Sequence, residues 1–135
     1  MGKLKRVLLI DDSEIDTFVS QRVIERAGFA ENIMVKHSAI EALEYLKLPN
    51  NQDQLPELIF LDINMPFMNG FGFIQAFDGL PESVREKCKI MVLSSSYHSK
   101  DIKRMTSHPS VLEFITKPLS QSILDRLDPI SQSPD

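Results

Sequence analysis

The sequence predicts an α/β domain built on a central parallel sheet, and three observations support this fold class. Strand-like and helix-like segments alternate along the chain. The strand-like segments are short, continuously apolar runs, as strands buried on both faces require. Crossovers between parallel strands are right-handed, which gives such a sheet helices on both faces. We therefore expect a doubly wound sheet of five parallel strands with five helices.

The first part of the chain predicts two strands and two helices. Residues 7–10 form a continuous apolar strand, and Ser13 then provides an N-cap for a helix with Asp16 in its first turn. Apolar residues of this helix recur in one helical stripe before Gly28 ends it: Ile15, Phe18, Val19, Val23 and Ala27. Residues 32–36 suggest a short second strand. Ser38 and Glu41 form a capping box for the second helix.

The remaining elements follow the same alternation. Residues 58–61, 90–93 and 111–115 are apolar strands, and residues 49–56 between the second helix and the third strand form a polar loop. A helix with Phe71, Ile74 and Phe77 at helical spacing follows the turn at Asn69-Gly70. Two more helices are predicted over residues 99–107 and 120–127.

Length and composition predict a single globular domain. The chain has 135 residues, of which 42% are hydrophobic and 25% charged, as in an ordinary globular domain. We expect one domain over residues 1–127, a flexible tail over residues 128–135 and no output domain. The net charge of −4 argues against direct binding of nucleic acid.

The sequence shows no membrane span and no signal peptide, and with its single cysteine it predicts a cytoplasmic protein. No apolar run approaches the ~20 residues of a membrane span, and no signal peptide precedes the first strand. The single cysteine, Cys88, cannot form an internal disulfide, which fits a reducing compartment.

Polar residues follow four of the five predicted strands. Asp11 and Asp12 follow the first strand, and Asp62 follows the third. Ser94 follows the fourth strand and Lys117 the fifth. Because the carboxyl ends of parallel strands share one edge, where ligands bind in open α/β sheets, we expect these five side chains to converge.

This set of side chains indicates a particular chemistry. Clustered carboxylates repel one another unless a cation compensates, and their oxygens suit Mg²⁺. Lys117 and Ser94 are suited to contact phosphate oxygens. A metal, a lysine and a hydroxyl around one aspartate are able to stabilise a phosphoryl group in transit.

These residues stand in motifs that resemble the receiver domains of two-component response regulators, the CheY-like family. The resemblance covers about residues 5–127. It rests on Val7 to Asp12, on Leu61 to Pro66 with Asn69-Gly70, on Val92 to Ser95, and on Phe114 to Pro118. It implies the flavodoxin-like strand order 2-1-3-4-5.

The resemblance also implies roles for individual residues. Asp62 matches the aspartate that accepts the phosphoryl group. Asp12 and Asp62 match the direct Mg²⁺ ligands, together with the backbone carbonyl of Asn64. Asp11 matches an acidic partner that usually acts through water.

Four further positions match functional residues of that family. Lys117 matches the lysine that contacts phosphate, and Ser94 matches the hydroxyl residue that moves toward the phosphoryl group. Phe114 matches the aromatic switch residue. The peptide bond between Lys117 and Pro118 is expected to be cis.

The function that the resemblance implies is a stand-alone phosphorylation switch. A sensor histidine kinase or a histidine phosphotransfer protein supplies the phosphoryl group, and an unidentified downstream protein receives the signal. Apart from its own phosphorylation and dephosphorylation, no enzymatic activity is expected.

The same residues bear on three other functions. A Mg²⁺-dependent phosphohydrolase with an aspartate nucleophile stays open as an alternative, although Asp11-Asp12-Ser13 lacks the Asp-x-Asp spacing of the haloacid dehalogenase type. A flavodoxin-like FMN carrier is disfavoured because Asp11 and Asp12 would repel a phosphate. A degenerate receiver that acts only as a scaffold is disfavoured by the intact acidic residues, Ser94 and Lys117.

Overall fold

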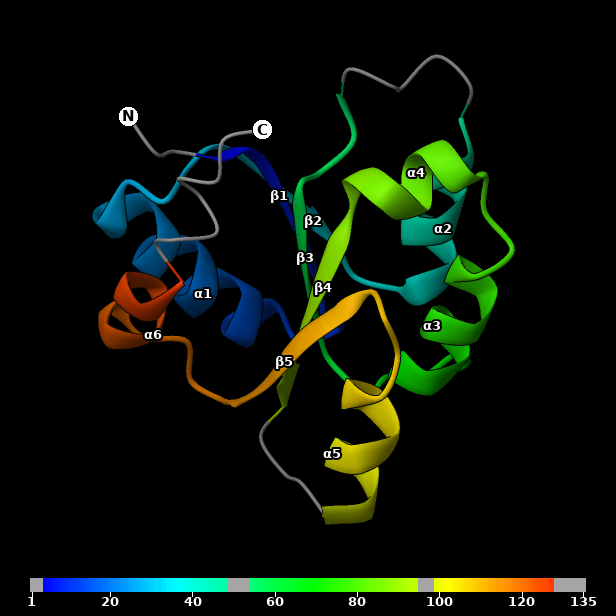
Figure 1. The fold of residues 1–135 in the computed structure, drawn as a ribbon. Helices are drawn as coiled ribbons and strands as arrows, with labels where there is room; N and C mark the ends of the chain where they lie inside the picture. Colours follow the sequence, from blue (N-terminus) through cyan, green and yellow to red (C-terminus); the bar gives the residue numbers. More distant parts are fainter. Residues whose placement is uncertain (1–3, 49–53, 95–98, 128–135) are drawn as a thin grey trace.

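The fold is a five-stranded parallel sheet between two layers of helices, seen in a computed structural model that describes residues 4–48, 54–94 and 99–127 (Figure 1). The predicted tail, residues 128–135, and Ser95 lie outside the described residues. The strands run in the order β2-β1-β3-β4-β5, all parallel. The α/β class and the expected strand order are thus confirmed.

The elements alternate along the chain as the sequence pattern predicts. The strands are β1 (Leu4–Ile10), β2 (Ala30–Lys36), β3 (Leu58–Leu61), β4 (Lys89–Ser94) and β5 (Val111–Thr116). The helices are α1 (Glu14–Ala27), α2 (Ala39–Lys47), α3 (Gly70–Phe77), α4 (Glu82–Lys87), α5 (Ser99–Thr106) and α6 (Gln121–Arg126).

The helix count is one more than expected. The described residues form six helices, and the additional one is α4. This helix has only six residues, begins after Pro81 and buries only Val84. Because one apolar residue produces no helical periodicity, the sequence pattern shows no stripe there.

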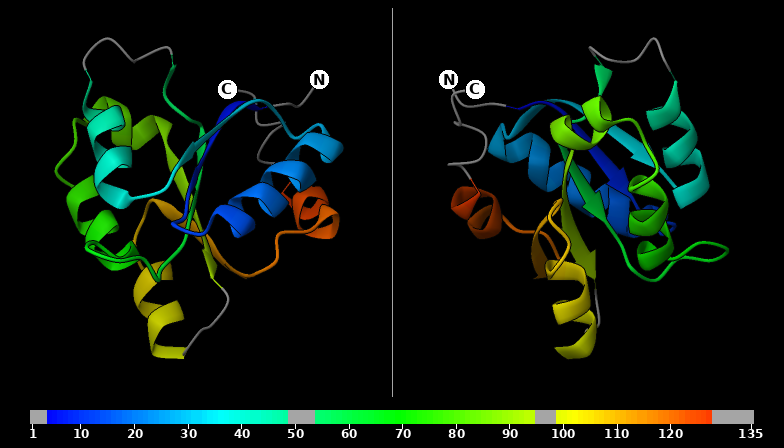
Figure 2. Two further views of the ribbon diagram at one scale, coloured as in Figure 1. Left: turned by 180° about the vertical axis from the view of Figure 1, so that it is seen from behind. Right: turned by 45° about the vertical axis from the view of Figure 1, so that its right-hand side comes forward.

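Each face of the sheet has its own apolar layer. Alternate strand residues such as Leu8 and Ile59 pack with α2, α3 and α4, whereas Leu9 and Phe60 pack with α1 and α6. Figures 1 and 2 show α1 and α6 on one side of the sheet and α2, α3 and α4 on the other. Continuous apolar strands are therefore required, because both faces of the sheet are covered.

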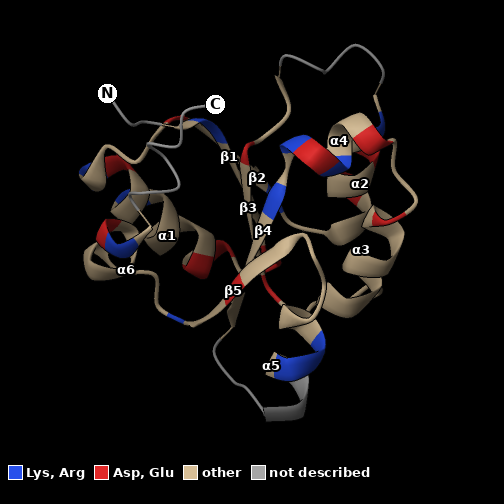
Figure 3. Ribbon diagram, viewed as in Figure 1, with Lys and Arg blue, Asp and Glu red and all other residues tan. Residues whose placement is uncertain are grey.

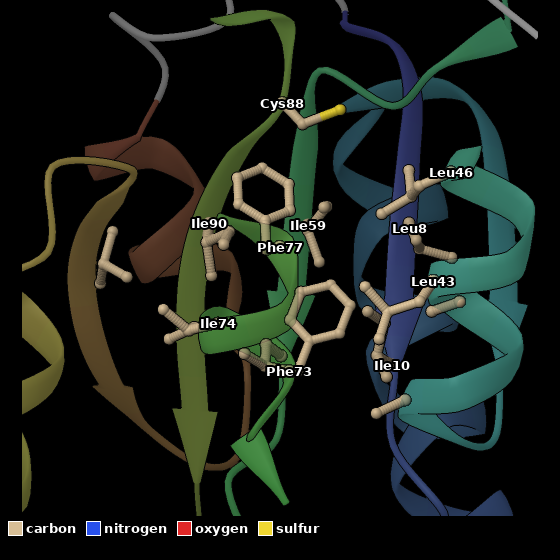
Figure 4. Packing of buried hydrophobic residues seen from close by; sticks show 14 of the residues in the cluster. Leu8, Ile10, Leu43, Leu46, Ile59, Phe73, Ile74, Phe77, Cys88 and Ile90 are labelled. Atoms are coloured by element: carbon tan, nitrogen blue, oxygen red, sulfur yellow. The ribbon is translucent and has the colours of Figure 1, made fainter. Parts of the chain in front are cut away.

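Figure 4 shows how α2 and α3 meet the sheet. Leu43 and Leu46 of α2 lie over β1, and Phe73 and Phe77 of α3 lie beside them over the central strands. Both phenylalanine side chains are fully buried. Cys88 is also buried here, and burial raises the pKa of its thiol to about 12, so the thiol stays protonated and unreactive.

The apolar stripe of α1 marks its buried face only in the second half of the helix, where Val23 and Ala27 are half-buried and pack against the core. Ile15, Phe18 and Val19 are exposed, with 76%, 62% and 41% of their surface accessible. The residues that α1 buries are instead Thr17, Ser20 and Ile24. Thr17 and Ser20 line a small cavity with Asp11 and Asp62. Small polar side chains on this face let the start of α1 approach the polar ends of the central strands.

Charged residues also lie on the helices that form the outer surface. Figure 3 shows acidic and basic segments on the helices, with basic residues in the last turn of α5, Lys103 and Arg104. None of the helices in the described parts of the chain is long and apolar enough to cross a membrane.

Gly70 closes the loop between β3 and α3 and leaves no space for a side chain. Its N–H donates to the carbonyl of Ile63 at 2.8 Å. A Cβ atom at Gly70 would lie 2.8 Å from the Cα of Ile63 and 3.0 Å from the carbonyl oxygen of Asp62. Both neighbours are backbone atoms, which cannot turn away as a flexible side chain can.

We expect Gly70→Ala to lower the free energy of unfolding by about 1–3 kcal/mol, because the loop must shift to admit a methyl group. Gly79→Ala is the matched control, since its Cβ would meet only the carbonyl of Ala76 at 3.4 Å. Urea unfolding of both variants measures the difference. Equal stability of the two variants would contradict this interpretation of the loop.

Candidate functional site

Two neighbouring strands place the acidic residues at one edge of the sheet. Ile10 and Leu61, the last residues of β1 and β3, are register partners. The N–H of Asp62 donates to the carbonyl of Ile10 at 3.0 Å, which continues the ladder one step beyond the strands. Asp11 and Asp62 therefore emerge side by side, as the strand pattern predicts.

Three carboxylates form a compact cluster at this edge. One side-chain oxygen each of Asp11, Asp12 and Asp62 lies within 4.8 Å of the others. Asp11 and Asp62 are buried, with 7% and 6% of their surface accessible, whereas Asp12 is exposed. The cluster is therefore open to solvent on the side of Asp12.

Burial and charge oppose the ionisation of Asp62. Burial, followed by the negative charge of Asp11, raises the pKa of Asp62 from 3.8 to about 6. The positive charge of Lys117 and a backbone hydrogen bond from Asn64 act in the opposite direction. The carboxylate of Asp62 is thus held at an energetic cost that a cation would relieve.

Lys117 supplies the positive charge of the site. Its Nζ donates to Oδ2 of Asp11 and to Oδ2 of Asp16, both at 2.7 Å, and lies 3.8 Å from Oδ2 of Asp62. Burial acts to lower the pKa of Lys117, but the hydrogen bonds to Asp11 and Asp16 and the charge of Asp62 outweigh it. The pKa is raised as a result, so the lysine stays protonated.

Ser94 and Phe114 lie on the two strands next to the acidic cluster. Ser94 is fully buried at the end of β4, and its carbonyl accepts a hydrogen bond from the N–H of Lys117 at 2.8 Å. Phe114 pairs with Val92 in the β4–β5 register, two positions before Ser94. Ser94 and Phe114 therefore face the same side of the sheet. The expected cis bond between Lys117 and Pro118 is present.

Asp16 is part of this site, although the sequence analysis assigns it only to the first turn of a helix. Its carboxylate is joined to Lys117 across 101 residues of sequence. One feature of the sequence could have assigned Asp16 to the site, namely its position about one helical turn after Asp11-Asp12. That spacing brings a carboxylate near the sheet edge, but it does not indicate which cation lies opposite.

The donor set fits a hard divalent cation. Three carboxylates offer oxygen ligands, and the open side at Asp12 leaves room for water, which Mg²⁺ retains in protein sites. A divalent cation would also relieve the repulsion that raises the pKa of Asp62.

Curated proteins with similar sequences include regulators of signalling. The two-component response regulator ORR1 of Oryza sativa subsp. japonica is 30% identical over 90% of this chain and 53% of its own length. The probable methanogenesis regulatory protein FilR2 of Methanothrix harundinacea is 29% identical over 89% of this chain and 76% of its own length. The chain thus spans about half the length of the rice relative.

Solved structures show the same fold over nearly the whole chain. A two-component response regulator from Cytophaga hutchinsonii has a TM-score of 0.89 and 29% identity, covering 98% of this chain and 99% of its own. A response regulator receiver protein from Dyadobacter fermentans has a TM-score of 0.84 and 26% identity, covering 96% and 99%.

The family profile described as the response regulator receiver domain matches residues 7–127. The match includes both acidic strand ends, Ser94 and Lys117. Together with the strand order and the similar solved structures, it shows that this chain belongs to the response regulator receiver domain family of two-component signalling.

Proposed function

We propose that Asp62 accepts a phosphoryl group from a sensor histidine kinase or a histidine phosphotransfer protein. Receiver domains take phosphate from such donors and bind Mg²⁺ in an acidic pocket, so membership of the family implies phosphorylation-dependent signalling. The observation that carries the proposal is the position of Asp62, a buried carboxylate between two other carboxylates and Lys117.

The proposed reaction transfers a phosphoryl group to a carboxylate oxygen. An oxygen of Asp62 forms a bond to phosphorus while the bond from phosphorus to the donor histidine nitrogen breaks, and the imidazole leaves with the electron pair. An acyl phosphate results, and water later cleaves it to regenerate Asp62 and inorganic phosphate. Chemistry of this kind depends mainly on positioning and on stabilising negative charge.

Mg²⁺ would be held by Asp12 and Asp62 and by the backbone carbonyl of Asn64, with Asp11 acting through water. When bound, the ion supplies positive charge for the phosphoryl oxygens. Among the chain's own groups, Lys117 offers an ammonium 3.8 Å from Asp62. Ser94 offers a hydroxyl from the neighbouring strand end. These two residues are the proposed phosphate contacts.

The signal would leave the site through β5 and α5. Ser94 turns toward the phosphoryl group, and Phe114 then occupies the space on the same side of the sheet. Phe114 is half-buried and packs at the margin of the core that includes Met105 of α5. The changed surface would bind an unidentified downstream protein, or the phosphoryl group would be relayed onward.

The proposed organisation is a receiver domain over residues 1–127 that does not catalyse reactions of a free substrate. A cytoplasmic location and the absence of direct nucleic-acid or membrane binding stay predictions. The alternative, a Mg²⁺-dependent phosphohydrolase, predicts repeated turnover of a free phosphomonoester, whereas a switch accumulates one acyl phosphate.

We expect acetyl phosphate with Mg²⁺ to add one phosphoryl group to the protein, and Asp62→Asn to abolish the addition because the amide is not a nucleophile. Intact-mass spectrometry measures both. Asp125→Asn, an Asp-to-Asn change on the exposed surface of α6, is the matched control and should be labelled like the wild type. Stoichiometric labelling of folded Asp62→Asn would place the acceptor at another residue.

The stability of the metal-free protein should depend on pH through Asp62. Its pKa in the folded protein, about 6, exceeds 3.8, so its stabilising contribution is complete below about pH 4 and is lost as the pH rises through about 6. Mg²⁺ relieves the carboxylate repulsion, so the Mg²⁺-induced rise in melting temperature should be larger at about pH 8 than at about pH 5.

Thermal melts with Mg²⁺ or with a chelator measure this difference, and two variants test its origin. Asp12→Ala should reduce the Mg²⁺ effect strongly without lowering the stability of the metal-free protein. Glu14→Ala, which removes another exposed carboxylate of the same segment, should keep the effect. A Mg²⁺ response that is equal at both pH values, or unchanged in Asp12→Ala, would contradict the assignment.

We expect the phosphoryl mimic beryllofluoride, added with Mg²⁺, to shift amide NMR signals of β5 and α5 in the wild type. Ser94→Ala and Phe114→Ala should confine the shifts to the site, with a lost coupling of about 1–3 kcal/mol. Leu112→Ala is the control, because Leu112 is an exposed residue of the same strand. Unchanged spreading of the shifts in both switch variants would exclude this route.

A further inference from the structure

We propose that Asp16 is a positioning residue that shares Lys117 with the phosphorylation site and thereby weakens the lysine's interaction with a phosphoryl group on Asp62. This inference rests on the proposed function. Lys117 donates to Asp16 and to Asp11 at the same distance, 2.7 Å, but lies 3.8 Å from Asp62. The ammonium is therefore hydrogen-bonded to the two residues beside the acceptor and not to the acceptor itself.

The backbone fixes where the carboxylate of Asp16 can lie. Asp16 is in the first turn of α1, and its N–H donates to the Oγ of Ser13, the N-cap, at 3.1 Å. Ser13 is in turn held by Asp11, whose Oδ1 accepts from its N–H at 2.9 Å. The cap thus fixes Asp16 relative to the acidic cluster, and Lys117 reaches it from the loop after β5.

The ammonium of Lys117 therefore interacts with three carboxylates, those of Asp11, Asp16 and Asp62. Each carboxylate that pairs with Lys117 reduces the field that the ammonium exerts on the others, so a phosphoryl group on Asp62 competes with Asp16 for the same lysine. The side chain of Asp16 is 42% accessible, whereas that of Lys117 is 12% accessible. Solvent screens Asp16 in part, so removing its charge should change binding at Asp62 by only about two- to fivefold.

The test uses the affinity for beryllofluoride in the presence of Mg²⁺, measured by fluorine NMR. We expect Asp16→Asn to bind the mimic about two- to fivefold more tightly than the wild type, because the neutral amide no longer competes for the ammonium. The cap stays intact, because the N–H of Asp16 donates to the Oγ of Ser13 and neither atom is changed by the substitution.

Two further variants separate sharing of the lysine from a general effect of charge or structure. Glu14→Gln removes one negative charge from the same helical turn without touching the pair between Asp16 and Lys117, and should change the affinity less than Asp16→Asn does. Asp16→Glu keeps a carboxylate and should remain closer to the wild type than to Asp16→Asn.

Each outcome decides the proposal. Equal gains in Asp16→Asn and Glu14→Gln, weaker binding by Asp16→Asn, or an Asp16→Glu variant that matches Asp16→Asn would overturn the role of Asp16. A wild-type protein that takes up neither beryllofluoride nor a phosphoryl group from acetyl phosphate would instead overturn the proposed function.

Discussion

The ion pair between Lys117 and Asp11 joins the loop after β5 to the end of β1, 106 residues apart in sequence and three strands apart in the sheet. Two buried carboxylates lie next to each other at this edge, and their repulsion must be offset if both are to stay ionised in the folded chain. The position of the ammonium therefore depends on β3 and β4 separating β1 from β5 correctly. The charge balance of the acidic site thus depends on the order of the strands, because that order brings Lys117 to Asp11.

Those features of the fold that arise from local patterns could be predicted from the sequence. Four-residue apolar runs such as 58–61 need cover on both faces, which indicates parallel strands and assigns Asp62 to the carboxyl edge. The positions of Asp11, Ser94 and Lys117 followed from the same reasoning. Strand direction places these residues at one edge of the sheet, and the motif resemblance then supplied the strand order and the proposed roles of the residues.

Features that depend on tertiary packing could not be predicted in this way. Ile15, Phe18 and Val19 are exposed although α1 buries two polar side chains nearby, so hydrophobicity alone selects the wrong side in the first half of this helix. The buried face is instead set by the polar residues that adjoin the acidic site. For the same reason the pairing of Asp16 with Lys117 has no local signature, since it requires the placement of α1 against the loop after β5.

The strand order also determines when the parts of the site come together during synthesis. From β3 onward, each strand adds to an edge that earlier residues have already formed, because the sheet runs β2-β1-β3-β4-β5. Asp11, Asp12 and Asp62 all leave the ribosome before Lys117, which follows the last strand to be added. Until the residues after β5 have been synthesised, a nascent chain therefore holds all three carboxylates of the acidic cluster but lacks the one lysine that is hydrogen-bonded to Asp11 in the folded protein.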